Sequence, residues 1–198
     1  MNTIVLDGIV RNIEYSHTIN GVEYDKAQIL VKGRTGKENL INLKFKKLSN
    51  TYKNNDNVKL LGNVRTYTRK VDDRTKVDVY VFTYFDNADT YTETANQVML
   101  DGKICKSNGL RKTRDGKDVL DFILANNIVT NEGILNCYVP CVAWGRHAKE
   151  VAKLPIGSPL NIVGEMQSRE YRKYLNDVDF ELKIAHEVSI TSIINGGE

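Results

Sequence analysis

The chain has 198 residues, a mass of 22.4 kDa and a net charge of +3, with 28 Lys and Arg against 25 Asp and Glu. Its 41% hydrophobic and 27% charged residues are ordinary for a globular chain and exclude a collagen-like or fully disordered protein. No apolar run approaches the ~18 residues of a transmembrane helix. Residues 1–8 also lack the basic start and long apolar stretch of a signal peptide, so we expect a cytoplasmic protein.

Alternating apolar residues and turn dipeptides predict five strands in each half of the chain. Asn20-Gly21 and Asp115-Gly116 are hairpin-turn signals after the first strand of each half. A short polar or helical piece covers 48–56, and 145–154 has the pattern of a helix closed by Pro155. The expected strands are 3–15, 24–32, 38–47, 57–70 and 76–85, then 97–106, 118–127, 134–144, 159–174 and 178–193.

The two halves repeat one another. Three short matches recur in the same order at offsets of 94, 99 and 102, which small insertions would produce, and they indicate a duplicated domain of about 95–100 residues. The matches are Leu6-Asp7-Gly8 with Leu100-Asp101-Gly102, Phe45 with Trp144, and Leu61-Gly62 with Val163-Gly164.

Five strands with a helix between the third and fourth is the order of the OB barrel. We therefore predict an all-β protein of two tandem five-stranded OB-fold barrels, each with a short helix between strands three and four. The expected domains are 1–90 and 97–198, joined by a linker at 91–96.

The fourth strand of each half has one apolar and one polar face, because side chains alternate along a strand. The polar face carries cations around an aromatic ring in both halves, which suits the phosphates and exposed bases of single-stranded nucleic acid. A solvated strand surface with Tyr as a good strand former is the alternative, and we weigh the two about evenly. The polar faces are Asn63, Arg65, Tyr67 and Arg69, then Glu165, Gln167, Arg169, Tyr171 and Lys173.

Further candidate contacts flank the third strands. Tyr138 and Trp144 have the same parity, Trp144 precedes Arg146, and Phe45 of the first half precedes Lys46 and Lys47. The only Trp of a chain is ordinarily a core residue, and a charged hairpin is ordinarily solvated, so both alternatives stand. The hairpin of the second half adds three cations, Arg111, Lys112 and Arg114, in a loop that can close over a bound strand.

Catalytic and metal-binding patterns are missing from the sequence. We find no P-loop, nucleophile elbow or metalloprotease motif, and expect neither an enzyme nor a cofactor nor a metal site. The odd count of three cysteines, Cys105, Cys137 and Cys141, argues against a secreted disulfide framework, and we read them as small, partly buried residues.

Four stretches of the second half form a family pattern. They are Asn96-Gln97-Val98-Met99-Leu100-Asp101-Gly102, Phe122-Ile123-Leu124-Ala125, Tyr138-Val139-Pro140-Cys141-Val142-Ala143-Trp144-Gly145 and Leu160-Asn161-Ile162-Val163-Gly164-Glu165-Met166. Through them the second half resembles the bacterial and phage single-stranded DNA-binding protein family over nearly all of 96–193, and the first half resembles it more weakly.

The resemblance implies base stacking at Tyr138, Trp144 and Tyr171. In the first half, Phe45 matches Trp144, whereas Asn39 matches Tyr138 and leaves one ring missing. Two-barrel members of this family tend to be dimers, which implies a homodimer presenting four OB folds. The chain ends at Glu198 without the long acidic tail that often recruits replication proteins, so we expect no tail-mediated recruitment.

We therefore expect a nucleoid-associated protein that protects or organises single-stranded DNA without sequence specificity in replication, recombination or repair. RNA stays an alternative ligand, because stacking does not read the 2′-hydroxyl. The alternative function is an adaptor or protein-interaction module on an OB scaffold, similar to the primosomal replication protein N of replication restart.

Overall fold

Extended backbone accounts for most of the chain. The structure, a computed structural model, describes residues 1–47, 52–71, 74–87, 96–130, 133–174 and 179–194. In the first half the strands are β1 (Asn2–Ile19), β2 (Val22–Lys32), β3 (Glu38–Lys46), β4 (Asn57–Val71) and β5 (Arg74–Asn87). In the second half they are β6 (Asn96–Lys112), β7 (Asp118–Thr130), β8 (Gly133–Trp144), β9 (Pro159–Tyr174) and β10 (Phe180–Ile194), with helix α1 (Gly145–Val151) after β8.

Each set of five strands closes into a barrel. In the first half, β1 pairs with β2 and β4, β3 pairs with β2 and in parallel with β5, and β4 pairs with β5. The second half repeats this order from β6 to β10. A closed five-stranded sheet of this order is the OB fold, so the predicted fold is confirmed. Residues 91–95 of the expected linker lie outside the described residues, and the domain boundaries stay a prediction.

The core of each barrel follows the period of two along its strands. On β3, Ile41, Leu43 and Phe45 are at most 1% exposed, whereas Asn42 and Lys44 between them are only half-buried. The same alternation places Met166 of β9 in the second core, as the sequence predicted for the apolar face of strand four.

Four glycines of the sequence repeat lie where a neighbouring strand crosses them closely. A side chain at any of them would collide with a backbone carbonyl, so the repeated glycines follow from barrel closure. A Cβ atom would lie 2.2 Å from the oxygen of Leu30 at Gly8, 2.4 Å from that of Phe82 at Gly62, 2.3 Å from that of Ala125 at Gly102 and 2.6 Å from that of Ser189 at Gly164.

The helix between strands three and four is present in the second barrel. Helix α1 ends at Val151, three residues before the expected end at 154, and it buries Ala148 and Val151. In the first barrel, residues 52–56 form a turn without a helix, and 48–51 lie outside the described residues.

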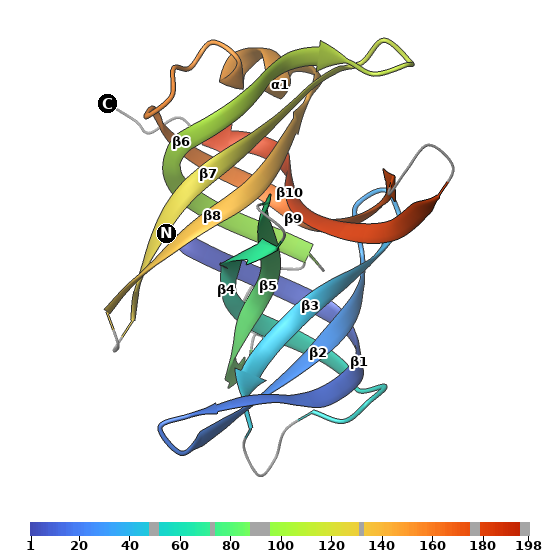
Figure 1. The fold of residues 1–198 in the computed structure, drawn as a ribbon, viewed down its shortest axis with the longest axis vertical. Helices are drawn as coiled ribbons and strands as arrows, with labels where there is room; N and C mark the ends of the chain where they lie inside the picture. Colours follow the sequence, from blue (N-terminus) through green and yellow to red (C-terminus); the bar gives the residue numbers. More distant parts are fainter. Residues whose placement is uncertain (48–51, 72–73, 88–95, 131–132, 175–178, 195–198) are drawn as a thin grey trace.

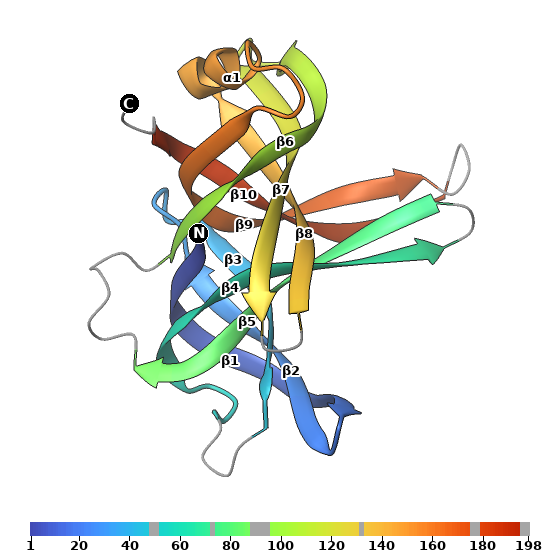
Figure 2. The same cartoon turned by 90° about the vertical axis from the view of Figure 1, so that its left-hand side faces the viewer.

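The two barrels join through their first strands. β1 and β6 run antiparallel, from Asn2 opposite Leu100 to Leu6 opposite Asn96, and this pairing makes one ten-stranded sheet (Figure 1). Ile4 lies opposite Val98 at the centre of this pairing. The β4–β5 and β9–β10 hairpins project on the same side of the molecule (Figure 2).

Candidate nucleic-acid interface

The third strands of the two barrels can be matched through their parallel partners. Leu43 of β3 pairs with Val81, and Cys141 of β8 pairs with Val188, so Leu43 and Cys141 occupy equivalent positions. The structural offset between β3 and β8 is therefore 98 residues, one fewer than the 99 that matched Phe45 with Trp144.

This difference of one residue corrects the prediction for Phe45. Phe45 is 0% exposed and packs edge-to-face against Tyr52 in the core, with 5.5 Å between the ring centroids. Because a shift of one residue moves a side chain to the opposite face of a strand, Phe45 offers no ring to a ligand. Lys46, not Phe45, is equivalent to Trp144, and Leu40, not Asn39, is equivalent to Tyr138.

Three predicted stacking residues of the second barrel are accessible. Trp144 ends β8 and is 42% exposed, Tyr138 on the same strand is 45% exposed, and Tyr171 on β9 is 38% exposed. A ring that is exposed to this extent on a rigid strand has a free face for a base. The structure therefore keeps Trp144 out of the core, where the only Trp of a chain would ordinarily lie.

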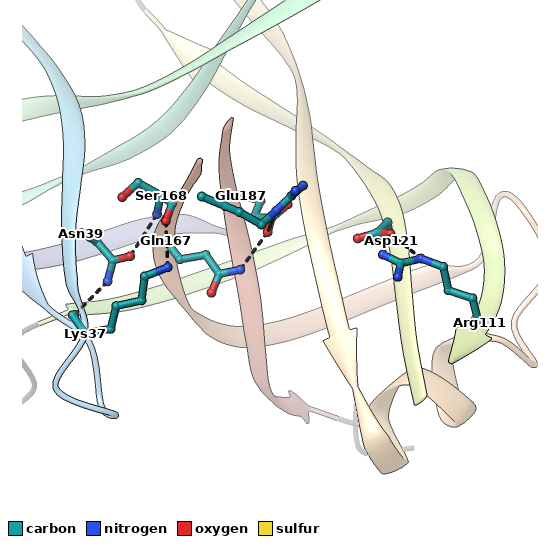
Figure 3. A network of polar contacts seen from close by, with 8 residues as sticks. Lys37, Asn39, Arg111, Asp121, Gln167, Ser168 and Glu187 are labelled. Carbon is teal, nitrogen blue, oxygen red and sulfur yellow. Dashed lines mark hydrogen bonds and ion pairs between the residues drawn. The ribbon is translucent and has the colours of Figure 1, made fainter. Parts of the chain in front are cut away.

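Cations gather around the strand end that carries Trp144. Trp144 lies opposite Val119 of β7, and Val119 lies opposite Arg111 of β6, so the three form one row across the sheet. Arg111 donates to Asp121, which lies two residues along β7 from Val119 (Figure 3). Arg146 is exposed on α1, and Arg114 is exposed in the β6–β7 turn. Arg111 and Lys112 belong to the end of β6 rather than to the turn itself, which begins at Thr113.

Asp118 holds two cations beside this row. Its carboxylate is 3.0 Å from Nζ of Lys112 and 3.2 Å from Nζ of Lys149. Hydrogen bonds from Lys112, the larger contribution, and from Lys149 lower the pKa of Asp118, so the carboxylate stays charged at neutral pH. Lys112 is thus neutralised in part before any ligand arrives.

The polar face of β9 is turned partly inward. Gln167 and Arg169 both donate to Oε1 of Glu187 on β10, at 2.8 and 3.3 Å, and Glu187 is 8% exposed. Their side chains therefore have a protein partner, which the sequence pattern did not indicate. The side chain of Lys173, also predicted here, lies outside the described residues.

The first barrel covers part of this same strand. Asn39 accepts from the backbone N–H of Ser168, and Lys37 donates to the carbonyl of Ser168 (Figure 3). The backbone N–H of Arg34 donates to Glu165. The β2–β3 turn thus docks onto β9. The exposed end of β9 near Tyr171 is therefore accessible to a nucleic acid, whereas the part of β9 under the first barrel is covered.

The predicted cations of the first barrel also have partners. Nζ of Lys47 is 2.8 Å from Glu23, and a hydrogen bond to this carboxylate raises the pKa of Lys47. Arg69 is 2.7 Å from Asp78. The guanidinium of Arg65 lies over the Phe82 ring at 3.9 Å from its centroid. Tyr67, at 59% exposed, is the accessible ring on the face of β4 that we predicted.

Sequence reasoning missed several rings on the outer face of this barrel. Tyr24 of β2 stacks on His17 with 5.0 Å between centroids and lies 6.3 Å from Phe82 of β5, while Lys44 lies over Tyr80 at 4.5 Å. The sequence did contain a signal for the outward-facing rings of β5, because Asp78, Tyr80 and Phe82 alternate with apolar valines along this strand.

Across the described ranges, no three His, Cys, Asp or Glu side chains come together as a metal ion would require. The same ranges contain no helix of the length and apolarity needed to cross a membrane.

A family model described as the single-strand binding protein family matches residues 95–191, which span the second barrel up to the last three residues of β10. The second barrel belongs to that single-strand binding protein family. Among curated relatives, the chain is 35% identical over 107 residues to single-stranded DNA-binding protein A of Bacillus subtilis and 32% identical over 112 residues to the single-stranded DNA-binding protein of Bacillus cereus. Each alignment spans 52% of this chain and 62% or 63% of the relative, so about two fifths of each relative's length is unmatched.

Two solved structures match the fold of both barrels. The single-stranded DNA binding protein from Thermus aquaticus superposes with a TM-score of 0.71 at 16% identity, over 100% of this chain and 94% of that one. A deletion mutant of that protein gives a TM-score of 0.71 at 17% identity, over 100% and 95%. At this identity the likeness establishes the fold, namely a tandem pair of barrels.

Proposed function

We propose that the protein binds single-stranded DNA without sequence specificity, by stacking bases on exposed rings and neutralising phosphates with cations. The observation that supports this most directly is the exposure of Trp144, Tyr138 and Tyr171 in the barrel that belongs to the single-strand binding protein family. Stacking on such rings contributes ~1–3 kcal/mol per base and accepts any base, because every base has a π face.

The proposed contacts fall into two groups. In the second barrel, Trp144, Tyr138 and Tyr171 stack bases, while Arg146 and Arg114 meet phosphates. In the first barrel, Tyr67 stacks a base. The remaining candidates are Arg65, Arg69, Lys47, Arg111, Lys112, Gln167, Arg169 and Lys173, and those with a described carboxylate partner must exchange it for a phosphate oxygen.

The role of the whole protein extends this proposal. The chain acts as a binding protein without chemistry, protecting or organising single-stranded DNA in replication, recombination or repair, and it works at the nucleoid in the cytoplasm. Two copies form a homodimer that presents four barrels. The adaptor alternative is not favoured, since the family match points to DNA binding rather than to an adaptor. RNA is a second ligand to be compared.

Titration with oligo-dT tests the proposal through Trp144, whose fluorescence a stacked base quenches. We expect quenching, and we expect the affinity to fall as salt rises, because phosphate neutralisation releases counterions. Absence of both binding and quenching at low salt would overturn the proposal. Comparison with oligo-U of equal length decides between DNA and RNA, and gel filtration of the free protein tests the homodimer.

A further inference from the structure

The outer half of the β9–β10 hairpin has an edge that no other described strand covers. β10 pairs with β8 at Val188 and Ser189, so residues 180–187 have β9 as their one ladder partner among the described strands. The hairpin projects from the body of the molecule (Figure 2). An edge strand of this kind presents unpaired N–H and C=O groups to a further strand.

The side chains on one face of this edge are apolar and accessible. Phe180, Leu182 and Ile184 are 42%, 63% and 50% exposed. Tyr174, opposite Phe180 on β9, is 63% exposed, and the centroids of these two rings are 6.1 Å apart. The first barrel meets the same face farther along β10, at His186, which contacts β3. A group of large apolar side chains on a projecting edge indicates a surface that meets another protein.

The sequence of this edge matches itself when it is read in the opposite direction. In an antiparallel pair, residues directly opposite one another lie on the same face. With Leu182 opposite its own copy, apolar residues meet on one face and opposite charges meet on the other. The pairs are Leu182 with Leu182, Phe180 with Ile184, and Glu181 with Lys183. A shift of one residue would place apolar side chains opposite charged ones, so this register is favoured.

The charged pair of this edge is already in place within one chain. Nζ of Lys183 lies 2.9 Å from Oε2 of Glu181, and the two residues lie on the face opposite to Leu182. Antiparallel pairing with a second copy exchanges this contact for two equivalent contacts between the copies. The second copy is therefore complementary to this edge both in charge and in apolar surface.

The other edges of the two hairpins lack this self-complementarity. Val81 of β5 corresponds to Val188 of β10, because each pairs in parallel with the equivalent residue of its third strand. Counting back from this match, Arg74 and Lys76 take the places of the charged pair of β10. The same pairing of β5 would set these like charges opposite one another, which is destabilising. The edge of β9 carries three cations among residues 169–173, a composition that discourages edge pairing.

We infer that two copies of the chain join edge to edge along β10, in antiparallel register about a two-fold axis at Leu182. This inference rests on the proposed function, which includes a homodimer, and it assigns the surface through which the copies meet. Such a contact is isologous, because one patch serves both partners. Leu182 lies opposite Arg172, whereas Tyr171 lies opposite Lys183, so the apolar face and the proposed stacking face are on opposite sides of the hairpin. The pairing therefore leaves Tyr171 available to single-stranded DNA.

Charge reversal tests the register, which places Glu181 of each copy opposite Lys183 of the other. Glu181→Lys and Lys183→Glu each set like charges opposite one another, and we expect each variant to dimerise roughly tenfold more weakly than the wild type. A mixture of the two variants brings opposite charges together again, so we expect a mixed dimer that forms as readily as the wild-type dimer. Analytical ultracentrifugation of the full chain across a concentration series measures these dissociation constants.

Leu182→Lys tests the apolar face at the axis, where the two introduced cations would meet. We expect dimerisation to weaken by roughly tenfold or more, while binding of oligo-dT is retained. Thr68→Lys adds the same charge at an exposed position of the β4–β5 hairpin and is the matched control, with an unchanged dissociation constant. Thermal unfolding confirms that each variant is folded before it is measured.

The outcomes separate the inference from the function beneath it. If the wild type dimerises and all variants dimerise equally well, another surface joins the copies, so the inference is wrong and the proposed homodimer stands. If the wild type stays monomeric throughout the series, the inference and the homodimer both fail, and oligo-dT binding by the same preparation tests DNA binding separately. Weakened single variants whose mixture does not recover would contradict the inferred register.

Discussion

The backbone N–H of Tyr138 donates a 2.8 Å hydrogen bond to Oγ1 of Thr66, so β8 of the second barrel rests on β4 of the first. A matching bond joins the backbone N–H of Leu40 to Oγ of Ser168 at 3.2 Å. Tyr138 is equivalent to Leu40, and Thr66 to Ser168, so each barrel gives the other the same contact. The strand that carries two proposed stacking residues is thus held in place by the neighbouring barrel.

Thr66→Val should destabilise the protein by about 1–3 kcal/mol, because it leaves the partly buried N–H of Tyr138 without an acceptor. Thr66 is only 7% exposed, so water cannot readily replace the hydroxyl. Urea unfolding of the full chain measures the change. Thr68→Val, at an exposed position two residues along β4, is the control and should leave the midpoint unchanged. Equal midpoints for both variants would contradict a structural role for this bond.

Trp144→Ala and Phe45→Ala should separate binding from stability. We expect Trp144→Ala to weaken oligo-dT binding by ~1–3 kcal/mol with little change in unfolding, because Trp144 is exposed. Phe45→Ala should cost about 3–5 kcal/mol of stability through a core cavity. Anisotropy of a labelled oligonucleotide and urea unfolding report the two effects. If folded Phe45→Ala lost as much affinity for oligo-dT as Trp144→Ala, the result would contradict the core assignment and make Phe45 a nucleic-acid contact.

Asp118→Asn should strengthen DNA binding and steepen its salt dependence. The change releases Lys112 and Lys149 from their shared carboxylate. Each cation that then meets a phosphate adds about 0.7 to the slope of log affinity against log salt for a single strand. Asp115→Asn, in the exposed turn nearby, removes the same charge without freeing these lysines. An identical slope in the two variants would show that net charge alone governs the effect.

His186 should make the protein less stable as the pH falls below about 6.5. Its Nε2 is 2.8 Å from the carbonyl of Leu40 at the contact between the barrels, and burial lowers its pKa below 6.5 although Leu40 and Asp78 oppose the shift. As the pH falls, His186 is therefore protonated in the unfolded chain before it is protonated in the folded protein. The stability that the protein has above the unfolded-state pKa of His186 is then lost.

His186→Gln retains a donor for Leu40 and should flatten this pH dependence. The measurement is the urea midpoint at several pH values for the wild type and the variant. Asp118, whose pKa is lowered from 3.8, loses its contribution only as pH falls below that value and so does not obscure the comparison. A wild-type midpoint that does not fall toward pH 5 would contradict the prediction.

Most of the fold could be predicted from local sequence patterns. The repeat of Leu6-Asp7-Gly8 as Leu100-Asp101-Gly102 located the duplication, and the structure explains these glycines by the closeness of the facing carbonyls. The apolar face of β9, with Met166 in the core, was also predicted correctly. Such features depend on the alternation of side chains within one strand, which a sequence displays directly.

The errors and omissions arose where a second strand or barrel decides the outcome. Phe45 was matched to Trp144 because both are aromatic, but the pairing of Leu43 with Val81 sets the register one residue away. The partnership of Gln167 with Glu187 depends on the alignment of β9 with β10, and the contact of Asn39 with Ser168 depends on how the barrels meet. None of these contacts between strands can be predicted from the spacing of residues along the chain.

The pairing of β1 with β6 has the geometry of a two-fold axis. Ile4 lies opposite Val98, the same position of the repeat, and Asn2 opposite Leu100 is mirrored by Leu6 opposite Asn96. Two identical single-barrel subunits would meet in this way, with one patch serving both partners. In such an assembly every substitution occurs twice, on both surfaces together. Fusion into one chain removes that constraint, which allows one half to present Trp144 where the other presents Lys46.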